Sequence, residues 1–118
     1  MIALFDEEPS VLERIAAADE ILIPIPAAGE LYYGAYHSRR AAANVSRVDA
    51  LVQSHPIAAI DIESARRYGI IKSALRRKGT PIPNNDIWIA ALAKQYDASV
   101  ASRDQHFDAV DGLEVVRW

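Results

Sequence analysis

The sequence predicts a single α/β domain over residues 1–118, built as a three-layer α/β/α sandwich around a short-stranded, mainly parallel sheet. The chain has 118 residues, of which 51% are hydrophobic, and this length suits one core rather than two. Short apolar runs alternate with longer segments of helical periodicity. Strands that alternate with helices favour parallel pairing through right-handed crossovers.

The composition excludes several classes of protein. The chain contains no cysteine, which excludes disulfides and thiolate metal sites and fits a reducing cytoplasm. Its apolar stretches are too short for a membrane span, and its N-terminus lacks the basic region of a signal peptide. We therefore expect a cytoplasmic protein with no membrane partner. The net charge of −3 predicts no attraction to nucleic acid over the whole surface.

The first half of the chain predicts three helices and two strands. Apolar residues recur at helical spacing over 9–18, 27–40 and 45–54. The run over 20–24 is short, apolar and ended by prolines, and the run over 57–60 is similar in length, so both are predicted to be strands.

The second half predicts two helices and two strands. Asp61 is a suitable N-cap for a helix that closes at Gly79. The helix that follows, from Asp86 onward, is apolar nearly all round and should be enclosed by other elements. Strands are expected over 99–102 and 113–117. The apolar face of the helix after Asp61 is expected to consist of Ile62, Ala65, Tyr68, Ile71 and Leu75.

Three carboxylates stand at positions that would bring them together. Glu30 follows the first predicted strand, Asp86 opens the apolar helix, and Asp104 lies just beyond the strand over 99–102. In parallel α/β sheets, the carboxyl ends of the strands and the N-termini of the following helices share one edge, where ligands bind. Taken singly, Asp86 could favour the helix dipole, Glu30 could be a solvated residue, and Asp104 could stabilise a turn.

Converging carboxylates repel one another and raise each other's pKa unless a cation compensates them. Mg²⁺ prefers oxygen ligands and keeps several waters, so a few carboxylates are sufficient to bind it. Such a site can activate water and stabilise the charge that develops on a phosphate, which is how nucleases use acidic clusters. The pattern of acids is therefore suited to metal-assisted hydrolysis of a phosphate ester.

Other polar and aromatic residues are interpreted structurally. The histidines, which are His37, His55 and His106, lack metal-ligand spacing, and none is expected to be catalytic. His106 is expected to stabilise the turn after Asp104. The tyrosines at 32, 33 and 36 are expected to pack in the core or in a dimer rather than to stack on bases. The basic clusters at 39–40, 66–67 and 76–78 are interpreted as solvated helix ends, with contact to an RNA backbone as the alternative.

Three segments resemble a known family. The runs GELYYGA (29–35), PNNDIWIAALA (83–93) and SRDQHF (102–107) resemble the PIN-domain family, and specifically the VapC-type toxins of toxin–antitoxin pairs. The resemblance covers essentially the whole chain, with its motifs in the family's order. It implies a Mg²⁺- or Mn²⁺-dependent endoribonuclease toxin of a type II pair.

The resemblance also implies roles for particular residues. Glu30, Asp86 and Asp104 match the family's second, third and fourth acidic residues, which bind metal and activate water. Ser102 matches a position where a hydroxyl helps to orient the acids. The implied partners are an RNA substrate, a small antitoxin whose C-terminal segment occupies the active-site groove, and a second copy in a homodimer.

One departure from the family lies at the start of the chain. The family begins with a strand that ends in an Asp, usually within D-T-N or D-T-S, whereas residues 1–5 and the DEEPSVLERI that follows look like the sequence just after that motif. We therefore expect an N-terminally incomplete domain with a weakened site. Two rescues are conceivable: residues 1–5 take the strand position and Asp6 replaces the acid, or a second copy supplies a strand.

Two other functions remain as alternatives. The first is a catalytically impaired toxin that acts only as an antitoxin-binding module. The second is a phosphoacceptor signalling domain in which Asp61 would be the acceptor, although residues 99–105 lack the lysine that such a domain needs.

Overall fold

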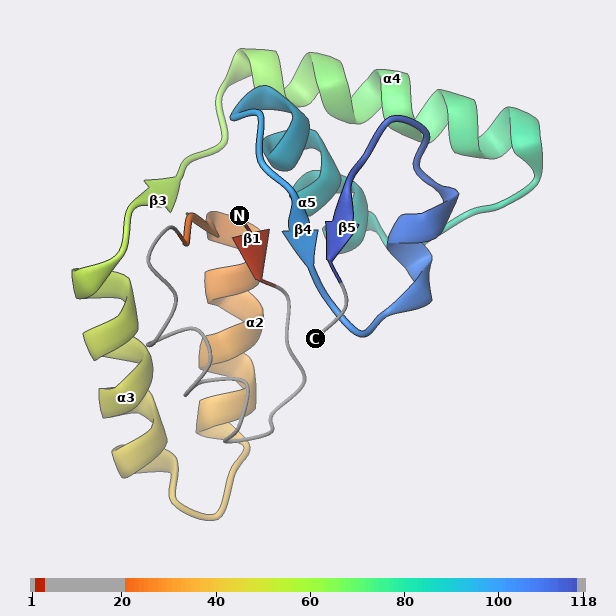
Figure 1. The fold of residues 1–118 in the computed structure, drawn as a ribbon. Coiled ribbons are helices and arrows are strands. Elements are labelled where there is room, and N and C mark those ends of the chain that lie inside the picture. Colours follow the sequence, from red (N-terminus) through yellow and green to blue (C-terminus); the bar gives the residue numbers. More distant parts are fainter. Residues whose placement is uncertain (1, 4–20, 117–118) are drawn as a thin grey trace.

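The computed structural model describes residues 2–3 and 21–116 (Figure 1). Its strands are β1 (Ile2–Ala3), β2 (Ile23–Pro24), β3 (Ile57–Ala58), β4 (Val100–Ala101) and β5 (Val115–Val116). Its helices are α2 (Ile25–Tyr36), α3 (Ala41–Ser54), α4 (Ile62–Lys78), α5 (Asn84–Gln95) and the 3-10 helix η1 (Gln105–Ala109). The helix predicted over 9–18 lies outside the described residues.

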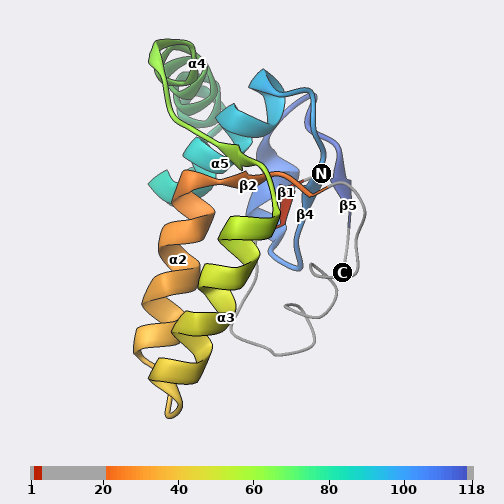
Figure 2. The ribbon, with the colours of Figure 1, turned by 90° about the vertical axis from the view of Figure 1, so that its left-hand side faces the viewer.

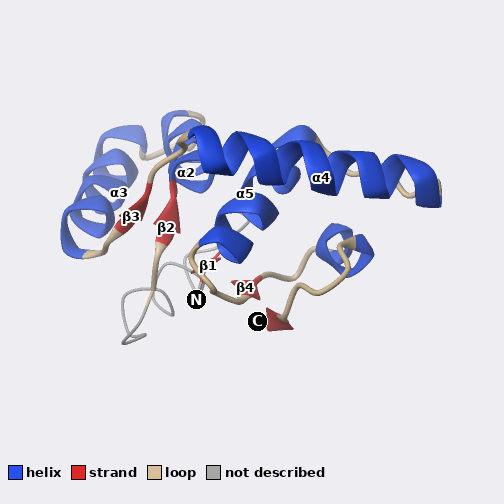
Figure 3. Cartoon of the chain, turned by 90° about the horizontal axis from the view of Figure 1, so that it is seen from above, coloured by secondary structure: helices blue, strands red, loops and turns tan. Residues whose placement is uncertain are grey.

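The strands pair in parallel throughout the described part of the chain. One sheet has the order β1-β4-β5, in which Val100 is the register partner of both Ile2 and Val115. The other joins β2 to β3, with Ile23 opposite Ile57. β1 also lies against β2, so the strands follow one another as β3, β2, β1, β4 and β5 (Figure 3). The predicted α/β class with short parallel strands is confirmed, although each strand is only two residues long.

The start of the described chain takes a strand position in the sheet, as in the first of the two conceivable rescues. Ile2–Ala3 pairs with β4 and lies between β4 and β2, which is the central position. A central strand such as β4 needs backbone partners on both sides, and β1 supplies them on one side while β5 supplies them on the other. Asp6, the conceivable replacement for the first acid, lies outside the described residues.

Helices α2 and α3 form an antiparallel pair beside the strands (Figure 2). Each begins before its predicted start, α2 at Ile25 and α3 at Ala41. Pro26 stands in the first turn of α2, where proline is tolerated because the early N–H groups have no partner in the helix. The Tyr32 hydroxyl donates to Asp49 Oδ1 at 2.5 Å and so ties α2 to α3.

Two of the three tyrosines on α2 do not pack in the core of the chain, and packing in a dimer, the other expectation, stays a prediction. Tyr33 and Tyr36 are 64% and 65% exposed. The reason is the face that α2 presents to its neighbours, which is made of small residues and one leucine, namely Ala27, Ala28, Leu31, Gly34 and Ala35. Because the helix repeats every 3.6 residues, positions 33 and 36 fall on the other side.

Helix α4 has the ends that its sequence predicts. Asp61 Oδ1 accepts a hydrogen bond from the Ser64 backbone N–H, and Ser64 Oγ accepts one from the Asp61 N–H, which is a capping box. Gly79 closes the helix at a φ of 71°. Ile62 was wrongly expected on the buried face, since it is 87% exposed. The buried stripe begins instead at Ser64 and continues through Ile71 to Leu75.

Helix α5 is enclosed, as predicted. Residues Ile89 to Ala93 have no exposed surface, and all of them except Leu92 belong to the core cluster that contains Val100 and Phe107. The helix begins at Asn84, two residues before the predicted start at Asp86. Across the described residues, none of the helices combines the length and the apolar character that a membrane span requires.

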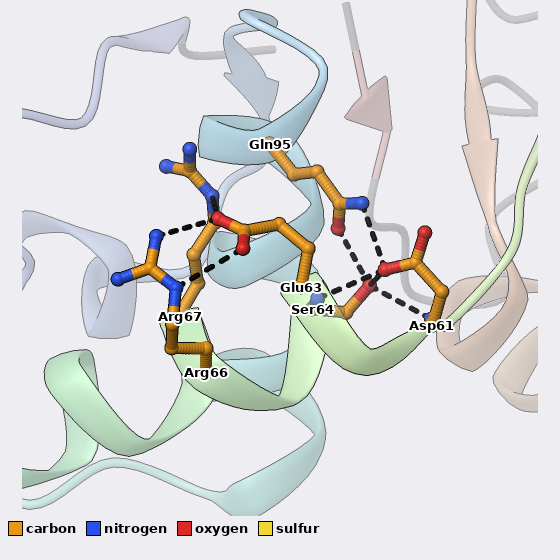
Figure 4. Close-up of polar contacts among 6 residues, drawn as sticks. All are labelled: Asp61, Glu63, Ser64, Arg66, Arg67 and Gln95. Atoms are coloured by element: carbon orange, nitrogen blue, oxygen red, sulfur yellow. Dashed lines mark hydrogen bonds and ion pairs between the residues drawn. The ribbon is translucent and has the colours of Figure 1, made fainter.

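A polar network around the buried Ser64 joins α4 to α5 (Figure 4). Ser64 Oγ donates to Gln95 Oε1 at 2.5 Å, and Gln95 Nε2 donates to Asp61 Oδ1 at 2.9 Å. These hydrogen bonds, led by that from the Ser64 backbone, lower the pKa of Asp61. Asp61, which was considered as a phosphoacceptor, is therefore held as the N-cap of α4.

We predict that Ser64→Ala destabilises the fold by about 1–2 kcal/mol, because it removes a buried hydroxyl that donates to Gln95 and accepts from the Asp61 N–H. The free energy of unfolding, measured by urea denaturation, checks this. Ser73→Ala is the matched control, since Ser73 is an exposed serine on the same helix. Equal stability losses in the two variants would contradict the importance of the network.

Candidate metal centre

Asp86 and Asp104 meet at the carboxyl edge of β4. Asp86 is the third residue of α5 and is only 5% exposed. Asp104 follows β4 and is the N-cap of η1. A carboxylate oxygen from each lies within 4.8 Å of the other and of a His106 nitrogen. The edge expected from the topology therefore does bring these two acids together.

The turn between β4 and η1 fixes the Asp104 carboxylate. The Asp104 backbone N–H donates to Ser102 Oγ at 2.9 Å, and Ser102 itself is buried. The Asp104 carboxylate accepts in turn from the His106 backbone N–H at 2.9 Å. Asp104 therefore also stabilises a turn, which was the alternative role considered for it. The same turn directs its side chain toward Asp86.

His106 stands between the two carboxylates. Its Nδ1 lies 2.9 Å from Asp86 Oδ2 and 3.0 Å from Asp104 Oδ1. The imidazole therefore contacts both acids, and the three side chains each offer one possible ligand atom within 4.8 Å of the others. Sequence reasoning favoured a turn-stabilising role for His106 over contact with substrate, and it missed this contact with Asp86. The signal available was the spacing D-x-H directly after a strand, because an Asp that caps a tight turn receives the N–H two residues later.

Glu30 approaches the cluster through Asn85. Its Oε1 accepts a hydrogen bond from Asn85 Nδ2 at 2.9 Å, and Asn85 precedes Asp86 in α5. The negative charge of Glu30 is also felt at Asp86, where it raises the pKa. Glu30 is not in the group whose ligand atoms lie within 4.8 Å of one another, so the structure places it beside Asp86 and Asp104 rather than in contact with them.

The pKa of Asp86 is raised above its ordinary value. Burial is the main cause, because removing a carboxylate from water disfavours its charged form. The negative charges of Asp104 and Glu30 raise it further, and the hydrogen bond with His106 opposes the shift. A cation placed among these acids would favour the ionised form of Asp86 and relieve the repulsion.

The sequence profile of the PIN domain matches residues 1–113 of the chain. The chain belongs to the PIN-domain family. Two curated relatives show which kind of PIN domain it is. Ribonuclease VapC2 of Rickettsia felis is 28% identical over 108 residues, which cover 91% of this chain and 81% of that protein. Ribonuclease VapC2 of Haemophilus influenzae is 31% identical over 90 residues, which cover 75% and 68%. The PIN domain is therefore of the VapC toxin type.

Solved structures share the fold of this PIN domain. The structure of VapBC2 from Rickettsia felis, bound to a DNA fragment from its promoter, matches with a TM-score of 0.80 and 25% identity over 100% of this chain and 99% of that chain. The FitAcB structure from Neisseria gonorrhoeae matches with a TM-score of 0.78 and 24% identity over 98% and 96%, and shows likeness of fold.

Proposed function

We propose that this PIN domain is the toxin of a toxin–antitoxin pair and cleaves RNA as a divalent-metal-dependent endoribonuclease. The observation that carries the proposal is the meeting of Asp86 and Asp104 at the sheet edge. Glu30 is hydrogen-bonded to Asn85, the residue that precedes Asp86. The curated relatives named as ribonucleases support the reaction class. A relative from Salmonella typhimurium, 29% identical, is named a tRNA(fMet)-specific endonuclease.

The residues present fit Mg²⁺ or Mn²⁺. Two carboxylates converge, one of them is buried with a raised pKa, and a third carboxylate stands beside them. Oxygen donors of this kind suit hard divalent cations. Glu30, Asp86 and Asp104 would hold the ion. When bound, it would stabilise negative charge on the phosphate and lower the pKa of water.

The chain's own residues would orient the reaction. Burial and the first turn of α5 hold Asp86 in place, while the hydrogen bond to Ser102 fixes the loop that carries Asp104. Glu30 is only partly exposed and is held by Asn85, so its carboxylate can accept a proton from the attacking water near Asp86.

The proposed partners follow from the same family. Structures named VapBC from Rickettsia felis and Salmonella typhimurium share this fold and support an antitoxin as a protein partner. We propose a small antitoxin that covers the acidic edge, and a homodimeric toxin. Size-exclusion chromatography with light scattering tests the dimer.

RNA cleavage in the presence and absence of a chelator tests the function. EDTA should abolish cleavage, and added Mg²⁺ or Mn²⁺ should restore it. Glu30→Gln should lower the cleavage rate about 10-fold or more, because it keeps an oxygen for Asn85 but removes the charge. Glu114→Gln is the control, since Glu114 is exposed and directly precedes β5, at the amino end of the strand.

Two outcomes would contradict the proposal. Cleavage that continues in EDTA would exclude metal-assisted hydrolysis. Absence of cleavage with either metal, in a folded chain that binds an antitoxin, would favour the antitoxin-binding module instead.

A further inference from the structure

Lys72 stands at the rim of the acidic edge in a contact that the function described above does not use. Its ammonium lies 3.3 Å from Asn84 Oδ1 and 3.3 Å from the Tyr68 hydroxyl, and the Tyr68 hydroxyl donates to the same Asn84 oxygen at 3.2 Å. Lys72 and Tyr68 come from α4, whereas Asn84 is the first residue of α5. The three polar groups therefore form a closed triad between the two helices.

The Tyr68 ring is itself held in place. It stacks on Trp88, with the ring centroids 4.2 Å apart and the planes 27° from parallel. The Lys72 ammonium lies 5.4 Å from the centroid of the Tyr68 ring, within the range of a cation–π contact. The stack and the triad together give a long, exposed lysine a defined position.

The charge of Lys72 is available to an anion. Its hydrogen-bond acceptors among the described residues are two neutral oxygens, those of Tyr68 and Asn84. Elsewhere on α4, Arg66 and Arg67 are paired with Glu63, and Lys78 is paired with Asp111. An ammonium has three donors, so one remains for a further acceptor after these two contacts.

The first turn of α5 links Lys72 to the proposed reaction site. Asn84 contacts Lys72, Asn85 contacts Glu30, and Asp86 contacts His106. Three consecutive side chains thus reach α4, α2 and η1 in turn. Lys72 is therefore connected to the acidic edge through the first turn of α5.

A polyanion needs such a cation at this place. The chain carries a net charge of −3, and its proposed site is a cluster of acids, so an RNA strand is repelled unless a local positive charge compensates. We infer that Lys72 binds a backbone phosphate of the RNA next to the cleaved bond, and that Asn84 and Tyr68 are positioning residues that hold its ammonium. This inference rests on the proposed function for the identity of the substrate.

Binding of a labelled single-stranded RNA in EDTA, where no cleavage occurs, tests the inference. Lys72→Ala should weaken binding about 10-fold, the effect of losing one charged hydrogen bond. The slope of log K against log salt concentration should fall by about 0.7, the value for one phosphate contact on a single strand. Lys72→Arg should restore most of the affinity because it keeps the charge.

Control variants separate this site from general charge. Arg47→Ala removes an exposed cation from α3, away from α4 (Figure 1), and should leave RNA binding unchanged. Tyr68→Phe keeps the ring that stacks on Trp88 but removes the hydroxyl, and should weaken binding only while Lys72 is present. Equal losses in Lys72→Ala and Arg47→Ala, or no loss in Lys72→Ala, would overturn the inference.

The outcomes also separate this inference from the proposed function. If the unaltered chain cleaves RNA with a metal but the Lys72→Ala variant binds RNA normally, the Lys72 contact is wrong and the proposed nuclease activity holds. If RNA binding depends on Lys72 but no metal supports cleavage, the Lys72 contact holds and the proposed nuclease activity is wrong. Failure of the unaltered chain to bind RNA in EDTA would overturn the Lys72 contact, whereas the proposed nuclease activity is decided by the cleavage assay with metal.

Discussion

Asp86→Asn should abolish RNA cleavage while making the metal-free protein more stable at neutral pH. We expect the cleavage rate to fall about 100-fold or more. Mutating a residue that only hydrogen-bonds a metal ligand already lowers metal affinity or activity about 10- to 100-fold, and Asp86 is proposed as a ligand itself. The stability gain follows from the raised pKa of Asp86, which arises mainly from burial and also from the charges of Asp104 and Glu30. Replacing the carboxylate with an amide of similar shape removes a buried charge from an acidic cluster.

The sign of the pH dependence follows from the same shift. Because the folded-state pKa of Asp86 lies above its unfolded value, the folded state favours the protonated acid. The contribution of Asp86 to stability is therefore fully present below the unfolded pKa of about 3.9 and is lost as the pH rises through the folded pKa. The stability advantage of Asp86→Asn should accordingly be small in acid and grow toward neutral pH.

Thermal melts with and without Mg²⁺ measure both effects. Mg²⁺ should raise the melting temperature of the unaltered chain, because it binds the folded state, and should have little effect on Asp86→Asn. Asp97→Asn is a matched control: Asp97 is exposed just beyond the C-terminal end of α5, and its φ of 53° suits asparagine. A loss of stability in Asp86→Asn at neutral pH, or a normal response to Mg²⁺, would contradict this account of the site.

Local chemistry explains which parts of the fold could be predicted. The bounds of α4 follow from Asp61 and Gly79, because a capping side chain and a left-handed glycine act within one turn of the helix. The start of α5 was missed because Pro83 is its N-cap, and no side-chain cap marks the spot. Strand lengths were overestimated because pairing with neighbours, rather than the apolar runs themselves, determines where a ladder ends.

Some contacts in the candidate site could likewise be predicted from the sequence, and others could not. The meeting of Asp86 and Asp104 follows from topology, since a helix start and a strand end share one edge of a parallel sheet. The spacing D-x-H indicates the backbone hydrogen bond from His106 to Asp104, but the contact of the His106 ring with Asp86 depends on the 3-10 turn that carries the ring back toward α5. Lys72 was likewise unmarked in the sequence, because its position depends on the packing of Tyr68 against Trp88.

Phe107→Ala should cause the largest loss of stability of any variant considered, about 3–5 kcal/mol, through lost burial and a new cavity. Phe107 has no exposed surface and packs in the core with residues of α5 and with Val100. A loss of this size is a large part of the total stability of about 5–15 kcal/mol that a domain has. Urea denaturation measures it. Tyr36→Ala, which removes an exposed aromatic ring, should change the free energy of unfolding by less than about 0.5 kcal/mol.

The same residue couples the core to the chemistry. Phe107 directly follows His106 in η1, so its burial anchors the turn that holds Asp104 and His106 against Asp86. Phe107→Leu keeps an apolar side chain in the core and should remain folded, but the smaller residue should loosen the turn. We therefore expect Phe107→Leu to weaken the Mg²⁺-induced rise in melting temperature more than its modest loss of stability would explain. Unchanged Mg²⁺ affinity in a folded Phe107→Leu variant would show that the acids are held without this anchor.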